Sequence, residues 1–304
     1  MYPTLKTALF FASVISIIAC RGPNNTTLEP SNPTDISKQA KSLAAYPLRA
    51  HFNCLPETAA ILAAHRGTSK NKGFAENGRA GLKALIEKGI LIAEIDIAKT
   101  KDGIHFLFHD GVWDDETTGK GVVASTSWKQ AQKLLLRDSE GRLTSETLVH
   151  LDEYLDLAKG QVYLEIDFKS SANYGQVIQL IRAKKMASSV ILISYSEGQA
   201  RKLARLAPDM MISVSVRSKG DLRSYKKNGL KTNNIAAWTG RNGPSKATAQ
   251  ILKDEQIPIL VYPAKERINA LKSTATLIVT DYALDQKPII GKYDKKAYKA
   301  CLNE

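Results

Sequence analysis

Two carboxylates stand two residues apart in an otherwise apolar segment of this 304-residue chain. Glu94 and Asp96 alternate with isoleucines in the run Leu91–Ile97, which has the length and composition of a buried strand. Side chains two positions apart on a strand point to the same face. Two buried carboxylates this close repel each other and are driven towards protonation unless a cation lies between them. The pair therefore predicts a divalent cation site.

A third carboxylate, Glu165, lies near the end of another apolar run, Val162–Ile166, and is expected to project into the same cavity. Three carboxylates without an accompanying cysteine form a hard oxygen site, which suits Mg²⁺ or Ca²⁺ rather than zinc. Any single one of them could instead be a salt-bridged strand end. The three together at strand ends favour the metal site.

The tripeptide His65-Arg66-Gly67 follows directly on the first apolar run, Ile61–Ala64. Gly67 permits a sharp exit from the strand, the planar guanidinium of Arg66 could hold a phosphate oxygen, and His65 could transfer a proton near neutral pH. The tripeptide alone is a weak signal, because a lone histidine here would more often be a packed or surface residue.

A second histidine is expected to return to the carboxylates through a hairpin. The run 105–109 begins about eight residues after the second strand, too few for the crossover that joins parallel strands, so it must fold back. Lys101-Asp102-Gly103 supplies the turn. A two-residue turn at positions 102 and 103 sets His109 opposite Asp96, and a turn one residue earlier sets it opposite Glu94. Both registers predict an imidazole beside the carboxylates.

Eight short apolar runs recur after residue 60, with amphipathic stretches of helical spacing between several of them. This alternation predicts a parallel sheet with crossover helices, and eight units fit a (β/α)8 TIM barrel better than an open sheet. In such a barrel the chemistry lies at the C-terminal ends of the strands. The runs are Ile61–Ala64, Leu91–Ile97, Val162–Ile166, Val190–Ile193, Met211–Val216, Asn234–Trp238, Ile257–Tyr262 and Thr276–Thr280, and the expected helices include Ser145–Lys159, Gly198–Leu206 and Lys246–Glu255.

In order and spacing, the motifs of the chain resemble the glycerophosphodiester phosphodiesterase family. The resemblance implies a TIM barrel with a small insertion after the second strand, here about residues 111–144, with a helix-like segment at Trp128–Leu136. It also implies Glu94, Asp96 and Glu165 as metal ligands, His65 and His109 as the acid/base pair and Arg66 as a phosphate contact, with Glu76 and Asn77 as auxiliary residues. The motifs are AHRG at 64–67, Glu76-Asn77, Glu94-Ile95-Asp96, TKDG at 100–103, His109-Asp110, Leu164-Glu165-Ile166 and Thr280-Asp281.

The chain departs from the family pattern at three places. Ala75 stands where proline usually precedes the Glu-Asn pair. Asp167, two residues after Glu165, replaces a lysine that would face the phosphate, and Lys169 on the same strand face is a candidate to compensate. The segment Tyr262-Pro263-Ala264-Lys265 replaces an aromatic-Thr-Val-Asn run that often shapes the leaving-group pocket, so no particular alcohol is predicted.

We expect metal-dependent hydrolysis of a glycerophosphodiester to glycerol phosphate and an alcohol, in which one histidine activates the attacking oxygen and the other protonates the leaving alkoxide. One alternative is a phospholipase D-type activity on lysophospholipids or sphingolipids. A second alternative is a non-catalytic barrel lipoprotein that acts as a binding module. Asp167 favours that second alternative, whereas the presence of both histidines and all three ligands argues against it.

The first twenty residues predict export. Lys6 precedes the uncharged run Thr7–Ala19, which has the length of a signal-peptide core and is too short to span a bilayer. The sequence up to Cys20 resembles a bacterial lipoprotein signal, so we expect an exported bacterial protein with a lipid on Cys20, anchored on the periplasmic or cell-surface side of a membrane. Ordinary export without lipid is the alternative. The expected parts are a signal peptide at 1–19, a tether and pre-barrel segment at 20–56, and the barrel at 57–304.

Composition limits the classes of partner and fold. The 43 Lys and Arg against 30 Asp and Glu favour anionic partners such as phosphorylated substrates, and export argues against nucleic acid. Three cysteines are too few for a disulfide scaffold and lack the spacing of a zinc site. Closure of the barrel would bring Cys54 and Cys301 close enough for one disulfide. The remaining histidines, His51, His105 and His150, are expected at the surface.

Overall fold

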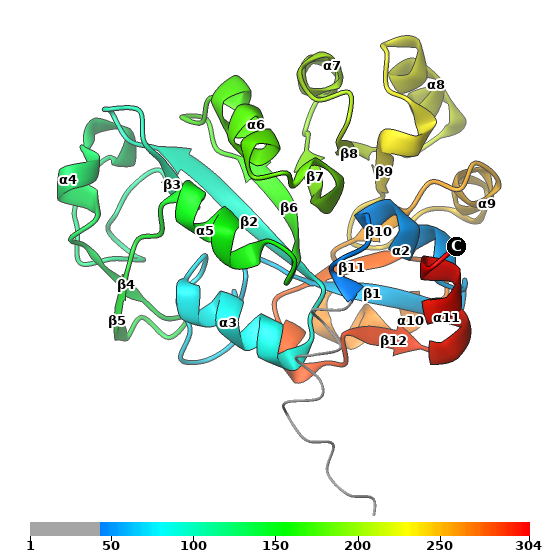
Figure 1. Cartoon of the computed structure of the whole chain (residues 1–304), viewed down its shortest axis with the longest axis horizontal. Coiled ribbons are helices and arrows are strands. Elements are labelled where there is room, and N and C mark those ends of the chain that lie inside the picture. Colours follow the sequence, from blue (N-terminus) through cyan, green and yellow to red (C-terminus); the bar gives the residue numbers. More distant parts are fainter. Residues whose placement is uncertain (1–42) are drawn as a thin grey trace, which may run out of the picture. The chain divides into compact units, whose positions relative to one another are not determined.

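Each of the eight apolar runs forms a parallel strand, and together the strands close into a barrel (Figure 1). The computed structural model describes residues 43–304, and every statement below concerns these residues. The last barrel strand pairs with the first, and the first pairs with the second, which leaves no gap in the ring. The predicted TIM barrel is thus confirmed. Its strands are β1 (Ala59–Ala64), β2 (Ile92–Lys99), β6 (Tyr163–Phe168), β7 (Val190–Ile193), β8 (Met211–Ser215), β9 (Ile235–Trp238), β10 (Ile259–Val261) and β11 (Leu277–Thr280).

Helices surround the barrel and connect its strands (Figure 1). Several begin at a residue whose side-chain oxygen accepts a hydrogen bond from an amide of the first turn, as Ser196, Ser218 and Asp294 do. The helices α7 and α9 begin and end within one residue of the predicted bounds. The helices are α2 (Leu48–Cys54), α3 (Arg79–Lys88), α5 (Leu151–Ala158), α6 (Tyr174–Ala183), α7 (Glu197–Leu206), α8 (Lys219–Lys227), α9 (Lys246–Asp254), α10 (Ile268–Leu271) and α11 (Lys295–Leu302).

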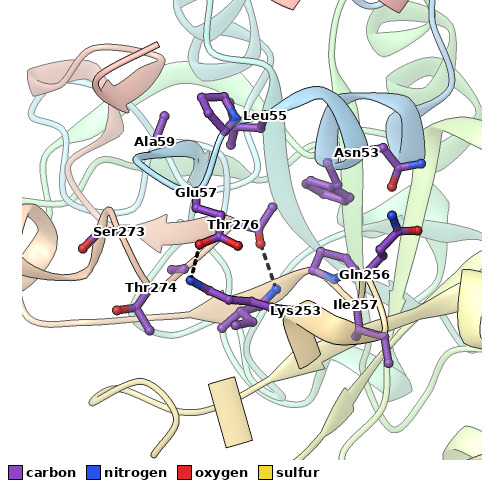
Figure 2. Close-up of a pocket in the computed structure, with 15 residues that line it drawn as sticks. Asn53, Leu55, Glu57, Ala59, Lys253, Gln256, Ile257, Ser273, Thr274 and Thr276 are labelled. Atoms are coloured by element: carbon purple, nitrogen blue, oxygen red, sulfur yellow. Dashed lines mark hydrogen bonds and ion pairs between the residues drawn. The ribbon is translucent and has the colours of Figure 1, made fainter. Parts of the chain in front are cut away.

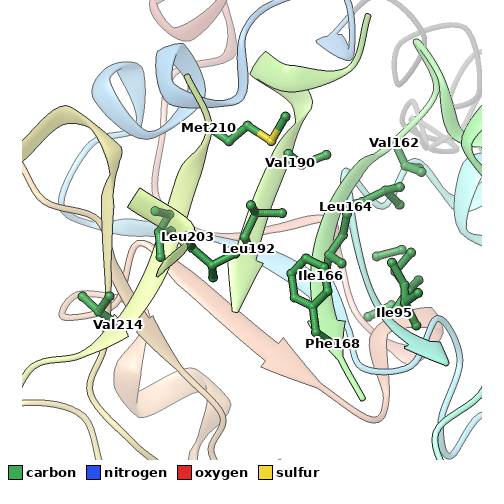
Figure 3. Close-up of a cluster of buried hydrophobic side chains, with 14 of the residues drawn as sticks. Ile95, Val162, Leu164, Ile166, Phe168, Val190, Leu192, Leu203, Met210 and Val214 are labelled. Atoms are coloured by element: carbon green, nitrogen blue, oxygen red, sulfur yellow. The ribbon is translucent and has the colours of Figure 1, made fainter. Parts of the chain in front are cut away.

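Alternating side chains of the barrel strands divide into an outer and an inner set. Figure 3 shows Leu164 and Ile166 of β6 with Leu192 of β7 and Leu203 of α7, in the layer between strands and helices. The residues between them in sequence point into the barrel, where the lower part is filled by apolar and aromatic side chains such as Tyr163. This period of two carries the acidic residues of β2 and β6 to the inner face.

An irregular segment with its own apolar cluster separates the barrel strand β2 from α5. It contains β3 (His105–Leu107), α4 (Trp128–Ala131) and the antiparallel pair β4 (Leu135–Arg137) and β5 (Leu143–Thr147). Two predicted helices are therefore too long. The segment expected to be helical to Leu136 turns into β4, because Leu136 packs in the cluster around Phe106 and Trp113. Helix α5 starts six residues later than predicted, because Glu146 accepts hydrogen bonds from the amides that begin α3.

The hairpin between β2 and β3 forms, but its register differs from both predictions. Ile97 pairs with Leu107, one residue away from either predicted alignment. The turn has three residues rather than two. Thr100 and Ile104 close it through the Thr100 amide and hydroxyl, and Gly103 takes the left-handed conformation that such a turn needs, with φ of 91°.

The N-terminal end of the barrel is covered by α2, which lies beside α11 (Figure 1). The predicted disulfide between Cys54 and Cys301 joins these two helices. The expectation for His51 was wrong, because its side chain is fully buried under the barrel. It contacts the hydroxyls of Tyr298 at 2.6 Å and Tyr163 at 2.7 Å, and burial lowers its pKa to about 4.

The other two histidines expected at the surface are partly exposed. His105 accepts a hydrogen bond from the Asn173 amide, and His150 caps α5 by accepting one from the Asp152 amide.

A hollow of about 140 Å³ opens at the N-terminal end of the barrel, where Lys253 donates to Glu57 (Figure 2).

Among the helices of residues 43–304, none is both long enough and apolar enough to cross a bilayer. The predicted signal peptide, Cys20 and the first part of the tether lie outside the described residues.

Candidate active site

Four carboxylates line the C-terminal half of the barrel interior on two neighbouring strands. In the parallel ladder of β2 and β6, Glu94 is the partner of Glu165, and Asp96 is the partner of Asp167. Each of the four residues is at most 5% exposed. We call this two-by-two arrangement the carboxylate array. It brings together the three predicted ligands and the aspartate that departs from the family pattern.

The array is electrostatically unfavourable by itself. Burial, followed by repulsion from Asp96, raises the pKa of Glu94 well above its usual range. Burial and the charge of Asp167 raise the pKa of Glu165 to about 8. A cation relieves such a cluster, because it compensates for the lost hydration and for the mutual repulsion.

The donor set fits a hard divalent cation. Glu94, Asp96 and Asp167 each offer an oxygen within 4.8 Å of the others, and Glu165 lies beside Glu94 in the ladder but outside this trio. Two buried oxygens, Oε2 of Glu165 and Oδ1 of Asp167, have no hydrogen-bond partner in the described part of the chain. Buried carboxylate oxygens usually have a partner, so these two atoms could each bind a cation.

Lys169 lies between the two aspartates of the array. Its ammonium is 2.6 Å from Oδ1 of Asp96 and 2.7 Å from Oδ2 of Asp167. Asn77 donates to the other oxygen of Asp96 at 3.0 Å, and the Tyr195 hydroxyl donates to Oδ2 of Asp167 at 3.0 Å. Lys169, the candidate to compensate for Asp167, thus forms ion pairs with both aspartates of the array.

Arg66 connects the array to His109. Its backbone amide donates to Oε2 of Glu94 at 2.8 Å, in a left-handed conformation with φ of 47° that is unusual for a residue with a side chain. Its guanidinium donates to Glu76 and to Nε2 of His109, both at 2.8 Å, and lies 3.9 Å from Asp96. Burial lowers the pKa of Arg66, but the hydrogen bond and charge of Glu76 and the other carboxylates outweigh it and raise the pKa.

His109 is connected to the array through Arg66, which contacts both His109 and Glu94. The sequence had predicted that His109 lies directly opposite a carboxylate of the array. Its Nδ1 lies 2.6 Å from Oδ1 of Asp110, so the ring carries its proton there and accepts from Arg66 at Nε2. Glu116 of the inserted segment completes a second acidic group with His109 and Asp110. Burial, followed by the charges of Glu76 and Asp110, raises the pKa of Glu116 to about 8.

His65 lies beside Glu94 of the array. Its Nε2 is 3.9 Å from Oε2 of Glu94, and its Nδ1 lies 2.7 Å from Oδ1 of Asp281 at the end of β11. The Tyr262 hydroxyl donates to the same oxygen of Asp281 at 2.8 Å. Burial raises the pKa of Asp281, but the hydrogen bonds from His65 and Tyr262 outweigh it and lower the pKa. Both histidines thus hold their Nδ1 proton against an aspartate.

A hollow of about 330 Å³ opens beside His65 over the ends of the later strands. Glu94 and Glu165 form part of its floor, Ser213 and Trp238 line its wall, and Arg241 lies over the Tyr262 ring with 5.0 Å between guanidinium carbon and ring centroid. The hollow can receive an organic group attached to a phosphate held at the array.

Sequence reasoning selected the two histidines, Arg66 and the carboxylates, and the structure brings these residues together. It assigned no role to Asp281, although the residue directly follows the last predicted strand. It also missed the partners Asp110, Tyr262 and Tyr195. For Asp281 a signal existed, because barrel closure sets the residues after the first and last strands side by side.

The chain matches known proteins over most of its barrel. Residues 65–277 match the model of the glycerophosphoryl diester phosphodiesterase family. A glycerophosphodiester phosphodiesterase from Caldanaerobacter subterraneus subsp. tengcongensis is 29% identical over 161 residues, which are 51% of this chain and 65% of that protein. The chain therefore spans slightly less than two thirds of that relative.

Solved structures share the fold. A glycerophosphoryl diester phosphodiesterase from Parabacteroides distasonis aligns with a TM-score of 0.68 at 21% identity, covering 84% of this chain and 90% of that one. A phosphodiesterase from Oleispira antarctica, in complex with the product sn-glycerol-3-phosphate, aligns with a TM-score of 0.56 at 18% identity, covering 84% and 99%.

Proposed function

The chain belongs to the glycerophosphoryl diester phosphodiesterase family, and from this premise we propose that it hydrolyses glycerophosphodiesters to glycerol phosphate and an alcohol with the help of a divalent cation. One observation carries the proposal. Two imidazoles, each fixed through Nδ1 by an aspartate, lie near a buried carboxylate array, His65 beside Glu94 and His109 against Arg66. Hydrolysis of a phosphodiester requires a proton acceptor for the attacking oxygen, a proton donor for the leaving group and positive charge near the phosphoryl oxygens.

Glu94, Asp96 and Glu165 are the proposed ligands of the cation, which we expect to be Mg²⁺ or Ca²⁺. When bound, the cation would neutralise negative charge that develops on the phosphoryl oxygens. The two buried oxygens without a partner in Glu165 and Asp167 support a cation at this place.

Arg66 is proposed to contact the phosphate. In the structure its guanidinium is engaged by Glu76 and His109. An arriving phosphate offers it a charged, bidentate acceptor in place of the neutral imidazole. The same exchange would release Nε2 of His109 for proton transfer, so substrate binding and activation of His109 are linked through one side chain.

His65 and His109 are proposed as the acid/base pair. Asp281 and Asp110 keep the Nδ1 protons in place, which leaves Nε2 of each ring available to the substrate. One ring would take a proton from the attacking oxygen, which is either water or a neighbouring hydroxyl of the substrate. The other ring, which must enter the step protonated at Nε2 as well as at Nδ1, would give its Nε2 proton to the leaving alcohol.

A turnover assay tests this function against its alternatives. Purified protein is incubated with glycerophosphocholine, glycerophosphoethanolamine, lysophosphatidylcholine or a lysosphingolipid, after chelation and after addition of Mg²⁺ or Ca²⁺. The proposal predicts metal-dependent release of glycerol phosphate. Turnover of the lysolipids alone would support the phospholipase D-type alternative, and binding without turnover would support the non-catalytic module.

The location of the protein is a separate proposal that rests on the sequence. The apolar run before Cys20 and the proline-rich segment after it support an exported protein held at a membrane by a lipid on Cys20. Mass spectrometry of the mature N-terminus decides it. A peptide that begins at an unmodified Cys20 would contradict the lipid anchor.

A further inference from the structure

The carboxylate array contains one acidic residue more than the predicted ligand set. Asp167 occupies the position next to Asp96 in the ladder, faces the same interior and is 5% exposed. A buried carboxylate that only disturbed the site would be costly, because it adds both a desolvation penalty and repulsion. Its surroundings therefore need an explanation.

The two oxygens of Asp167 have different environments. Oδ2 accepts from the ammonium of Lys169 at 2.7 Å and from the hydroxyl of Tyr195 at 3.0 Å. Oδ1 is buried and has no partner in the described part of the chain. The side chain is thus held through Oδ2, and one of its carboxylate oxygens lies within 4.8 Å of oxygens from Glu94 and Asp96.

Asp96 shows the opposite pattern. Lys169 donates to its Oδ1 at 2.6 Å and Asn77 donates to its Oδ2 at 3.0 Å, so both oxygens already have a donor. Glu165, like Asp167, has one buried oxygen without a partner among residues 43–304. The atoms most in need of a cation are therefore on β6.

We propose that Asp167 is an additional ligand of the divalent cation through Oδ1, and that Lys169 is a fixed counter-cation that holds Asp167 and Asp96 and offsets the extra negative charge. This inference rests on the proposed function. It treats Asp167, which departs from the family pattern, and its partner Lys169 as two parts of a single metal site.

Variants with matched formal charge test whether Asp167 binds the cation directly or only contributes negative charge near it. The array with Lys169 has a formal charge of −3, from four carboxylates and one ammonium. The double variant Asp167→Asn, Lys169→Met keeps that formal charge but removes the Asp167 oxygen. Glu116→Gln replaces a carboxyl group that lies 3.9 Å from Arg66 and outside the array, and it serves as a second control.

Binding of Mg²⁺ and Ca²⁺ to chelator-treated protein is measured by calorimetry. We expect both Asp167→Asn and the double variant to bind at least about 10-fold more weakly than wild type, since loss of metal-site partners commonly costs 10-fold to 100-fold. Glu116→Gln should change the Kd by less than about 3-fold, because Glu116 is not one of the four carboxylates of the array and its raised pKa already reduces its charge at neutral pH. Wild-type affinity in the double variant would overturn the ligand assignment.

Measurements of folding and of turnover distinguish a failure of the ligand assignment from an unfolded variant and from a failure of the proposed function. Far-UV circular dichroism and thermal unfolding are recorded for each variant, and Asp167→Ser tests the same oxygen if Asp167→Asn is not folded at the assay temperature. Wild-type turnover is measured on the same preparation. Metal-dependent turnover with an unchanged Kd in the double variant overturns this inference alone, whereas absent turnover overturns the proposed function and leaves the binding comparison readable.

Discussion

Asp281 binds Nδ1 of His65 at 2.7 Å although 216 positions separate the two residues in the sequence. The contact exists because closure of the barrel pairs Ala64 with Thr280 in neighbouring parallel strands, so the residues that follow emerge side by side. A carboxylate at Nδ1 holds a proton there and orients the ring, so that Nε2 is the nitrogen nearer to the array. The carboxylate that follows the last barrel strand thus orients the histidine that follows the first strand.

Asp281→Asn should lower kcat by roughly 100-fold to 10,000-fold with little change in KM, because the amide permits the wrong tautomer of His65. Steady-state kinetics on folded protein checks this. Tyr262→Phe removes one of the two hydrogen bonds to Asp281 and should cost far less. Equal losses in both variants would mean that Asp281 acts only through packing.

Glu94→Gln, Asp96→Asn and Glu165→Gln should each weaken divalent binding and lower activity while the barrel stays folded, since each change preserves side-chain volume. Chelation should do the same to wild type. Calorimetry with Mg²⁺ or Ca²⁺ and activity assays provide the measurements. Full activity in excess chelator, with wild-type rates in two of these variants, would contradict a carboxylate metal site.

The buried His51 should make the protein less stable in mild acid. Its pKa is lowered to about 4 in the folded state, against about 6.5 in the unfolded chain, so the unfolded state binds a proton first. The free energy of unfolding should therefore fall as pH decreases from about 6.5 to about 4, with a contribution on the order of 3 kcal/mol. Urea unfolding of wild type and His51→Gln across this range isolates the contribution, and parallel pH dependences would refute it.

The disulfide between Cys54 and Cys301 should stabilise the barrel without affecting catalysis, because it joins α2 and α11 at the opposite end from the array. Cys54→Ser with Cys301→Ser should lower the free energy of unfolding by about 2 to 4 kcal/mol. Denaturant unfolding and kcat/KM of the same sample check both statements. Two free thiols in unreduced, unfolded wild type would show that the bridge does not form.

Local patterns were sufficient to predict the barrel and its acidic interior. The period of two in β2 and β6 determines which face carries Glu94, Asp96, Glu165 and Asp167, and no distant residue is needed for that inference. The position of His65 and Arg66 directly after the first apolar run likewise predicted that both lie at the C-terminal end of a strand. These features depend on neighbours in the sequence, so the sequence alone contains them.

Other features depend on contacts between distant segments. The helix expected at Trp128–Leu136 ends at Ala131 and is followed by β4, because Leu136 packs in the cluster that contains Phe106 and Trp113. His51 is buried because α2 covers the barrel, which its own segment does not indicate. The hairpin register changed because Thr100 closes a three-residue turn with its side chain. Tertiary packing decided each of these cases over local preference.

The central claim is that His65 and His109 divide acid and base roles between them. The most direct measurement compares His65→Ala and His109→Ala on a glycerophosphodiester and on its p-nitrophenyl analogue, whose leaving group needs little protonation. On the natural diester each variant should lose on the order of 100-fold to 10,000-fold in kcat/KM. On the analogue one variant should recover nearly wild-type activity and the other should not. Near wild-type rates on the natural diester in both folded, metal-binding variants would contradict the claim.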